Sequence, residues 1–328
     1  MLRLVTAPDA DSIVPEEQWA QVATKAKPLF KWAGGKQRFL WEHRDLLPEI
    51  KGRYHEPFAG GLSVFFHLAA RSQGPLDASL GDVNLRVMRT YEEVKWDWVS
   101  VADRLRQLEA GYNAAEDKAA FYNDVRLQHN RVYPSADAAR FVFLMNVAWN
   151  GVFRINQAGS FNVPHGAVKG KLNLPDESLL AAVSGVLQHA RLRAQSWESG
   201  LSATSSGDFA FIDPPYFHSD DRRDLYEKNR AFGYSDHVRL ANTLVELKER
   251  GVDFMLTNSA YEEMIRLYRD RGLSVRVVDS HRSISSKANE RGREGELVVT
   301  PGTEVGNTML RSAQLKLLLG DAFDGNDE

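Results

Sequence analysis

The stretch DFAFIDPPYF, Asp208–Phe217, decides how this sequence is interpreted. Its apolar beginning is typical of a strand buried in a parallel sheet, and the acid Asp213 follows directly. Ligands of open α/β sheets bind beyond the carboxyl ends of the strands. Pro214 and Pro215 fix the backbone and donate no N–H, so we expect the Pro214 carbonyl to point outward beside the Asp213 carboxylate. These acceptors, with the flat face of Tyr216, suit a heteroaromatic amine that carries two N–H donors.

The composition excludes several classes of protein. The chain has 328 residues, of which 43% are hydrophobic, so it can bury a sizeable core. It contains no cysteine, which excludes disulfides, thiolate catalysis and thiolate metal sites, and fits a reducing compartment. No stretch approaches the roughly 20 apolar residues of a membrane helix. The formal net charge is -3, so a nucleic-acid partner would need a local basic patch.

The sequence around this stretch alternates between strand and helix patterns. Residues 53–61 predict a strand that ends in a glycine turn, and residues 77–84 predict a second strand that ends at Asp82. Residues 85–148 predict a series of helices, and residues 150–166 predict a hairpin-like loop rich in Asn and Gly. Because the α/β pattern then resumes, we predict a doubly wound α/β fold with an inserted helical module.

Two further stretches bear on ligand binding. The stretch FKWAGGKQ, Phe30–Gln37, lacks the first glycine and the final Ser or Thr of a Walker motif, which disfavours an ATPase. Asp82, at the end of a predicted strand, is the kind of carboxylate that accepts hydrogen bonds from a ribose hydroxyl pair. The alternative for such an acid is a helix cap.

Together these motifs carry a resemblance to a known family. In family order they are FKWAGGK at 30–36, HEPFAGGLSVF at 55–65, GDVN at 81–84, NGVFRIN with GSFNVPHG at 150–166, DPPY at 213–216, and HRSISSKANERGREGELVVT at 281–300. The chain resembles the Dam-type DNA N6-adenine methyltransferases, in the group whose cofactor motif precedes the DPPY motif. The resemblance covers the chain from about Pro28 to Thr300.

The resemblance implies a Rossmann-like class I methyltransferase sheet with an inserted helical DNA target-recognition domain. The boundaries it implies are a poorly ordered leader at 1–26, a discontinuous catalytic domain at 27–85 and 175–310, the inserted domain at 86–174 and a C-terminal tail at 311–328. It implies S-adenosylmethionine as the cofactor and no metal. The matching cofactor positions are Trp32, Lys36, Phe58, Gly60, Gly61, Asp82 and Asp213. Leu62 stands where the family often has another glycine, and we expect a local repacking there.

The resemblance also assigns catalytic and DNA-binding positions. The catalytic positions are Asp213, Pro214, Pro215 and Tyr216, and Asp213 is shared with the cofactor. The DNA-binding positions are Lys31, Trp149, Asn150, Val152, Arg154 and Pro164, with Arg282, Ser283, Ser285 and Lys287 as phosphate contacts. For Trp149 the alternative is a place in the core. We expect the polar loop at 217–234 to act as a lid.

These observations predict a site-specific DNA adenine N6-methyltransferase that flips adenine out of duplex DNA at a GATC-like site. The alternatives are a methyltransferase of another exocyclic amine, such as cytosine N4 or an RNA adenine, and a non-catalytic DNA-binding protein with a relict cofactor fold. We expect a cytoplasmic protein, encoded by a bacterium or a phage. We expect it to bind double-stranded DNA, as a monomer or as a dimer on DNA, and not to bind a membrane.

Overall fold

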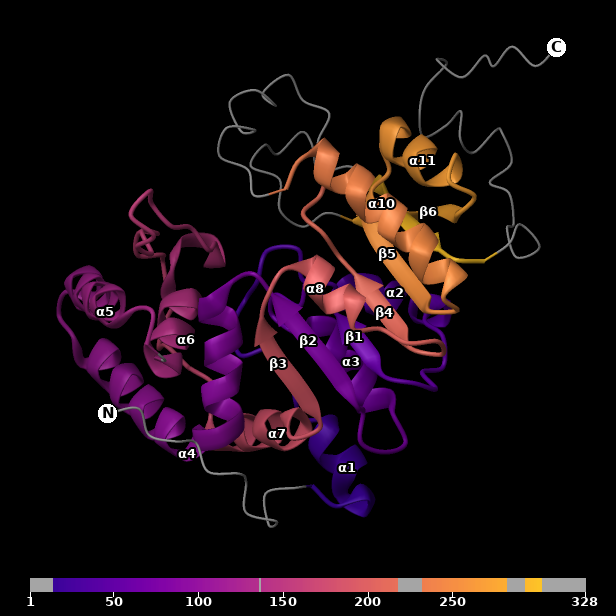
Figure 1. The fold of residues 1–328 in the computed structure, drawn as a ribbon. Helices are drawn as coiled ribbons and strands as arrows, with labels where there is room; N and C mark the ends of the chain where they lie inside the picture. Colours follow the sequence, from indigo (N-terminus) through magenta and orange to yellow (C-terminus); the bar gives the residue numbers. More distant parts are fainter. Residues whose placement is uncertain (1–13, 136, 218–231, 282–292, 303–328) are drawn as a thin grey trace. The chain divides into compact units, whose positions relative to one another are not determined.

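The computed structural model describes residues 14–135, 137–217, 232–281 and 293–302. Its strands form a seven-stranded sheet in the order β3-β2-β1-β4-β5-β7-β6 (Figure 1). This confirms the predicted Rossmann-like α/β fold. By its internal contacts the chain divides into a first unit, Met1–Leu46 with Arg53–Ser202, and a second unit, Leu47–Gly52 with Ala203–Glu328. The predicted boundaries between a catalytic and a recognition domain stay a prediction.

The first unit contains three parallel strands and most of the helices. In chain order its elements are α1 (Glu16–Ala23), α2 (Gln37–Glu42), η2 (Arg44–Leu46), β1 (Tyr54–Glu56), α3 (Ser63–Arg71), β2 (Ala78–Asp82), α4 (Leu85–Ala114), α5 (Lys118–Val132), α6 (Ala138–Val147), η3 (Trp149–Gly151), α7 (Glu177–Leu187), β3 (Ala190–Ala194) and α8 (Trp197–Ser202). β2 pairs in parallel with β1 and β3, in a register that places Asp82 opposite Ala194. Asp82 therefore lies at the carboxyl end of its strand, as predicted.

Helix α1 lies within the segment that the sequence predicts as a leader. Trp19 on this helix is fully buried, and its indole N–H donates to the Ala69 carbonyl at 3.1 Å. Burying an indole ring contributes on the order of 2–3 kcal/mol, which explains why these residues are part of the fold. Helix α1 is thus packed into the first unit, and the boundary of the predicted leader stays a prediction. Residues 1–13 and the predicted tail at 311–328 lie outside the described residues.

Helices α4, α5 and α6 lie together in the first unit (Figure 1). Aromatic rings pack between them. Phe143 of α6 lies edge-on to Tyr112 of α4, with ring centroids 5.7 Å apart, and to Phe121 of α5, with centroids 6.0 Å apart. His165 joins this cluster, since its ring Nε2 lies 2.8 Å from the Tyr112 hydroxyl. The contact of His165 with this cluster therefore holds the predicted 150–166 loop, called the 149–166 hairpin below, on the helices.

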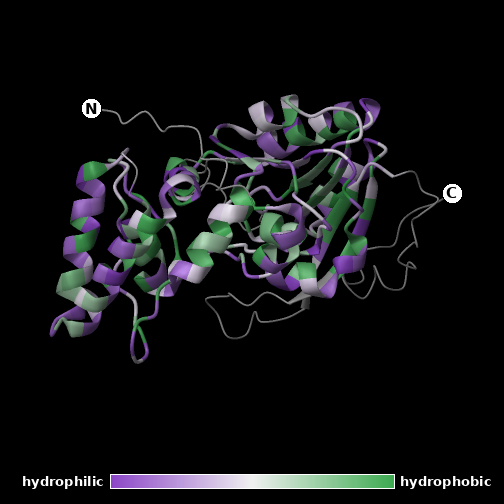
Figure 2. Cartoon of the chain, turned by 90° about the horizontal axis from the view of Figure 1, so that it is seen from below, coloured by the Kyte–Doolittle hydropathy of each residue, from purple (hydrophilic) through white to green (hydrophobic). Residues whose placement is uncertain are grey.

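Among its described residues, the second unit contains four strands and two helices: β4 (Phe209–Ile212), α10 (Tyr234–Glu249), β5 (Asp253–Ser259), α11 (Glu262–Arg269), β6 (Ser274–His281) and β7 (Arg293–Thr300). β4 and β5 are parallel, while β7 runs antiparallel to both β5 and β6. All residues of β4 are buried, as the apolar sequence predicts. In Figure 2 the strands are largely hydrophobic, whereas the helices also carry hydrophilic residues. Within the described ranges, no helix has the length and apolarity needed to cross a membrane.

Candidate functional site

The carboxyl end of β4 places Asp213 directly after the buried strand. The Thr257 hydroxyl, on the neighbouring strand β5, donates to Asp213 Oδ1 at 2.9 Å. Pro214 is buried, and Pro215 is exposed. The hydroxyl of Thr257 thus fixes the orientation of the Asp213 carboxylate, which sequence reasoning did not anticipate.

Tyr216 is half-buried, and its hydroxyl donates to the carboxylate of Glu296 on β7. Glu296 is only 6% exposed, so the hydrogen bond is shielded from water. Burial raises the pKa of Tyr216 well above its usual range, and the negative charges of Asp213 and Glu296 raise it further. The phenol therefore stays protonated at neutral pH and remains a donor. Glu296 positions the ring that the sequence predicts as a stacking face.

The backbone after Tyr216 is held by the end of β5. The Phe217 N–H donates to Asn258 Oδ1 at 3.0 Å, and the Ser259 hydroxyl donates to the Phe217 carbonyl at 2.6 Å. The Phe217 ring packs edge-on against Tyr261, with centroids 5.9 Å apart. The segment Asp213–Phe217, which we call the corner after β4, is therefore hydrogen-bonded to β5 at both of its ends. The rest of the predicted lid, residues 218–231, lies outside the described residues.

In the first unit, the ends of β1 and β2 bring Asp82 to the glycine turn. Asp82 accepts the Gly60 N–H at Oδ2, 2.9 Å away, and the Asn84 N–H at Oδ1, 2.7 Å away. Burial raises the pKa of Asp82, while these two hydrogen bonds oppose the shift. The side chain is half-buried, and the next residue, Val83, is 78% exposed. A carboxylate braced in this way has lone pairs left for further hydroxyl donors.

Trp32 lies against the glycine turn. A Cβ atom at Gly60 would come within 2.7 Å of Trp32 Nε1, and one at Gly61 within 3.0 Å of Trp32 Cβ. Gly60 also has a φ of 44°, which a larger residue would adopt only with strain. The structure thus brings Trp32, Gly60 and Gly61 together, and their role in cofactor binding stays a prediction. The glycines make room for the indole.

Leu62 follows these glycines with a φ of 60° and is fully buried. A non-glycine residue in this region costs roughly 1–2 kcal/mol. Leu62 therefore adopts a left-handed backbone conformation, which a glycine would adopt without this cost. The expected local repacking stays a prediction.

Lys36 and Phe58 both precede the glycine turn in the sequence. Lys36 is only 5% exposed, its ammonium donates to the Gly34 carbonyl at 2.9 Å, and its backbone N–H donates to the Ser63 hydroxyl at 3.2 Å. The Phe58 ring stacks on Trp197 of α8, with centroids 6.4 Å apart and planes inclined by 21°. A buried ammonium, a braced carboxylate and aromatic rings are groups that fit an amino-acid carboxylate, a ribose and a purine.

The 149–166 hairpin projects from the end of α6. It is closed by antiparallel bridges between Ala148 and His165 and between Ile155 and Phe161. Trp149 is 55% exposed, so the alternative that places it in the core is wrong. Asn150 is also exposed and has a φ of 54°, a left-handed turn that asparagine tolerates.

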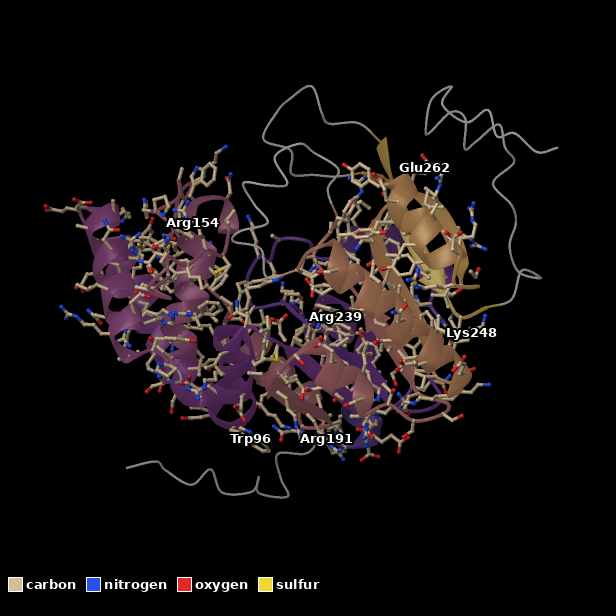
Figure 3. The ribbon with its side chains drawn as sticks, turned by 45° about the horizontal axis from the view of Figure 1, so that its top comes forward. Trp96, Arg154, Arg191, Arg239, Lys248 and Glu262 are labelled. Atoms are coloured by element: carbon tan, nitrogen blue, oxygen red, sulfur yellow. The ribbon has the colours of Figure 1, made fainter. Side chains whose placement is uncertain are left out.

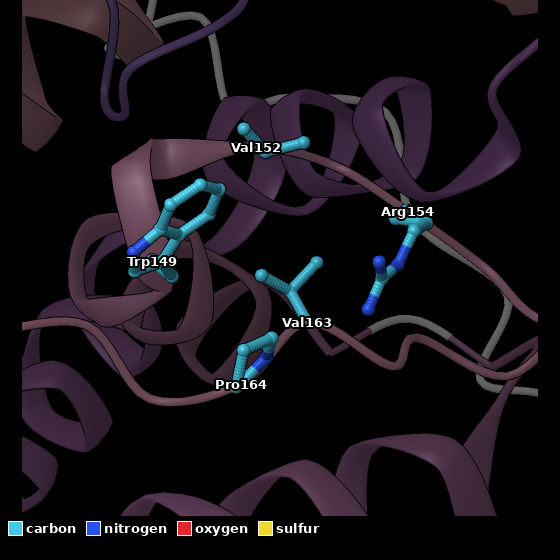
Figure 4. A pocket seen from close by; sticks show the side chains of 5 residues that line it. All are labelled: Trp149, Val152, Arg154, Val163 and Pro164. Atoms are coloured by element: carbon cyan, nitrogen blue, oxygen red, sulfur yellow. The ribbon is translucent and has the colours of Figure 1, made fainter. Parts of the chain in front are cut away.

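The hairpin carries a pocket of about 330 Å³ (Figure 4), lined by Trp149, Val152, Arg154, Val163 and Pro164. Arg154 is exposed (Figure 3), and its Nε and Nη2 donate to the side chain and backbone oxygens of Asn162 at 2.9 and 3.2 Å. The Val163 carbonyl accepts from Tyr122 and Arg126 at 3.1 and 2.7 Å. The structure thus gathers four of the predicted hairpin positions at one pocket, without Asn150, and the contacts of Val163 hold this pocket on α5.

Lys31 also lies at this hairpin, because a Cβ atom at Gly151 would be 3.1 Å from Lys31 Cβ. The predicted phosphate contacts Arg282, Ser283, Ser285 and Lys287 lie outside the described residues. Within the part of the chain that the structure describes, no group of three or more His, Asp or Glu side chains could hold a metal ion.

Besides Thr257 and Glu296, sequence reasoning missed Glu56, a buried carboxylate that supports the glycine turn. Glu56, at the end of β1, is 3% exposed and accepts from the Tyr54 hydroxyl at 2.7 Å and from the Phe65 N–H at 3.1 Å. Phe65 belongs to the first turn of α3, so Glu56 caps this helix and fixes the turn before it. The acid directly before the glycine turn was the available signal.

Comparison with known proteins identifies the family. Residues 32–284 match the family described as D12 class N6 adenine-specific DNA methyltransferase. A type II methyltransferase of Lactococcus lactis subsp. cremoris is 29% identical over 282 residues, which cover 84% of this chain and 95% of that protein. A type II methyltransferase of Methanocaldococcus jannaschii is 31% identical over 280 residues, covering 81% and 96%. A DNA adenine methylase of Vibrio cholerae is 27% identical over 281 residues, covering 84% and 95%. The chain therefore belongs to the D12 class N6 adenine-specific DNA methyltransferases, enzymes that methylate DNA and use a methyl donor of the S-adenosylmethionine type.

Proposed function

We propose that this enzyme transfers the methyl group of S-adenosylmethionine to N6 of an adenine that is flipped out of duplex DNA, at a GATC-like site. The observation that carries the proposal is the corner after β4, where Thr257 orients the Asp213 carboxylate and Glu296 holds the Tyr216 hydroxyl. These contacts fix an acceptor and a ring in advance of the substrate, and such preorganisation lowers the barrier of a transfer reaction.

Asp213 and the Pro214 carbonyl accept the N–H groups of the adenine amine in this proposal. The lone pair of N6 is delocalised into the ring, which makes the amine a poor nucleophile. Two acceptors that pull on its hydrogens favour tetrahedral geometry and localise the lone pair on N6. The ring of Tyr216 stacks on the base. The new N–C bond would form as the bond between the methyl group and the donor sulfur breaks and its electron pair stays on the sulfur, and Asp213 would accept the proton that N6 releases.

The residues of the first unit would bind the methyl donor. Asp82 accepts from the ribose hydroxyls, the Lys36 ammonium pairs with the amino-acid carboxylate, and Trp32 packs on the ligand, while the exposed Val83 offers an apolar face to the purine. When bound, S-adenosylmethionine supplies an activated methyl group on a sulfonium centre. The braced Asp82 carboxylate is the feature of this unit that supports the assignment best.

The 149–166 hairpin would engage the DNA. A base inside a duplex is out of reach of the corner, so the adenine must be flipped out, at a cost of a few kcal/mol. The exposed ring of Trp149 and the adjacent Asn150 suit the gap that a flipped base leaves. Arg154, already oriented by Asn162, presents a guanidinium that can read guanine. The GATC-like site rests on the resemblance of this hairpin to the readers of that sequence.

Methylation mapping tests the proposal. A plasmid is propagated with the protein in a host that lacks its own DNA methylation, and every modified base is located by single-molecule sequencing. N6-methyladenine confined to GATC-like sites is the expected result. N4-methylcytosine would refute the choice of base, and N6-methyladenine at an unrelated sequence would refute the assigned site.

A further inference from the structure

Arg86 is a buried cation that the site described above does not use. It lies in the first turn of α4 and is only 7% exposed. Burial lowers its pKa, yet no carboxylate among the described residues forms an ion pair with it, and its Nε is buried without a hydrogen-bond partner there. A buried charge without an opposite charge is costly, so contacts other than ion pairs must hold this side chain.

Two contacts hold the Arg86 side chain, and one of them is with the 149–166 hairpin. Arg86 Nη2 donates to the Gly159 carbonyl at 2.8 Å, and the guanidinium carbon lies 3.5 Å above the centroid of the Tyr133 ring. The first contact joins residues far apart in the sequence. The second is a cation–π contact between a planar guanidinium and an aromatic face, which suits arginine and not lysine.

Gly159 lies at the tip of the hairpin. The tip is closed internally by Asn156, whose N–H donates to the Ser160 carbonyl at 2.9 Å and whose carbonyl accepts the Gly159 N–H at 2.9 Å. The side chains of residues 154–158 are exposed. The hydrogen bond from Arg86 to the Gly159 carbonyl therefore fastens this exposed tip to α4.

The same hairpin carries Val152, Arg154 and Pro164 at its pocket (Figure 4). Because the hairpin is short and its strands are bridged at Ile155 and Phe161, movement of the tip also moves Arg154. The first turn of α4 is itself fixed, since the Asn84 side chain accepts the Arg86 N–H at 3.1 Å. Arg86 thus connects the hairpin to a rigid helix end.

We propose that Arg86 is a positioning residue for sequence selectivity: it holds the tip of the hairpin in register on the DNA without contacting a base. The proposal rests on the proposed function, in which this hairpin reads the DNA. An apolar residue could not take the place of Arg86, because the guanidinium donates a hydrogen bond to the Gly159 carbonyl and stacks its plane on the Tyr133 ring.

The test compares Arg86→Met with the unchanged enzyme. Methionine keeps an unbranched chain over Tyr133 but has no donor for Gly159. The measurement is kcat/KM on the mapped target duplex and on duplexes with one base pair changed. We expect the ratio between target and changed sites to fall about tenfold, the effect of losing one hydrogen bond of a charged donor. We expect kcat at saturating target DNA and the Kd of the methyl donor to stay unchanged.

Arg89→Met is the matched control, since it removes a charge from the same helix and should leave the ratio unchanged. Arg86→Lys, which keeps a donor without the planar stack, should give an intermediate ratio. If Arg86→Met does not fold, Tyr133→Leu removes the partly exposed ring beneath the guanidinium and should lower the ratio as well. An unchanged ratio in a folded variant, or an equal loss on all sequences, would overturn the proposal. If the unchanged enzyme methylates without sequence preference, the proposed function fails instead.

Discussion

Removing the Tyr216 hydroxyl should reveal how strongly Glu296 holds the ring. Tyr216→Phe keeps the stacking face but removes the donor to a carboxylate that is only 6% exposed. A hydrogen bond to a charged group contributes about 1.5–3 kcal/mol, and little screening by water is expected at this depth. The free energy of unfolding should fall by about that amount. In single-turnover assays the methyl-transfer rate should also fall, because the ring is no longer held in one orientation.

A double-mutant cycle that combines Tyr216→Phe with Glu296→Gln isolates the interaction free energy between these two side chains. Urea unfolding of both single variants and the double variant gives the coupling free energy, which we expect to be about 1 kcal/mol or more. Tyr234→Phe is the control, since Tyr234 is 46% exposed and its ring packs against the Phe217 ring. Additivity within about 0.5 kcal/mol would refute the reasoning, because it would show that the two groups act independently.

The remaining predictions concern the first unit. Asp82→Asn weakens the acceptor of the Gly60 and Asn84 N–H groups, so calorimetry should show that the Kd of the methyl donor rises about 10- to 100-fold; an unchanged Kd would remove Asp82 from the cofactor site. Burial lowers the pKa of His165 below 6.5, so the stability that it contributes is present above pH 6.5 and is lost as the pH falls through the lowered pKa. In thermal unfolding, His165→Gln should therefore lose less stability than the unchanged protein as the pH falls below 6.5, and equal losses would contradict the shift.

The sequence predicted the features that depend on neighbouring residues. Asp213 lies at the end of a buried strand, since the apolar run and the two prolines fix the strand and its end locally. Asp82 likewise lies at the end of β2, and Gly60 adopts the left-handed turn that follows β1. These features follow from patterns a few residues long, which is why the residue types alone were sufficient.

The contacts that brace the site were not predictable in the same way. Thr257 and Glu296 lie 44 and 80 residues beyond their partners Asp213 and Tyr216, on strands whose apolar pattern is unremarkable. Arg86 reaches across 73 residues to Gly159. The register and order of strands decide such pairs, and neither is written in a local pattern. The burial of Trp19 was not predictable for a related reason, because it depends on α3, which lies far along the chain.

The measurement that tests the central claim most directly is a single turnover on duplex DNA with an isotope-labelled methyl donor, followed by mass spectrometry of the released nucleosides. The unchanged enzyme should place the label on N6 of adenine. Asp213→Ala should bind the same duplex and yet transfer no label at saturating donor and DNA. Label on N4 of cytosine, or full transfer by Asp213→Ala, would contradict the account.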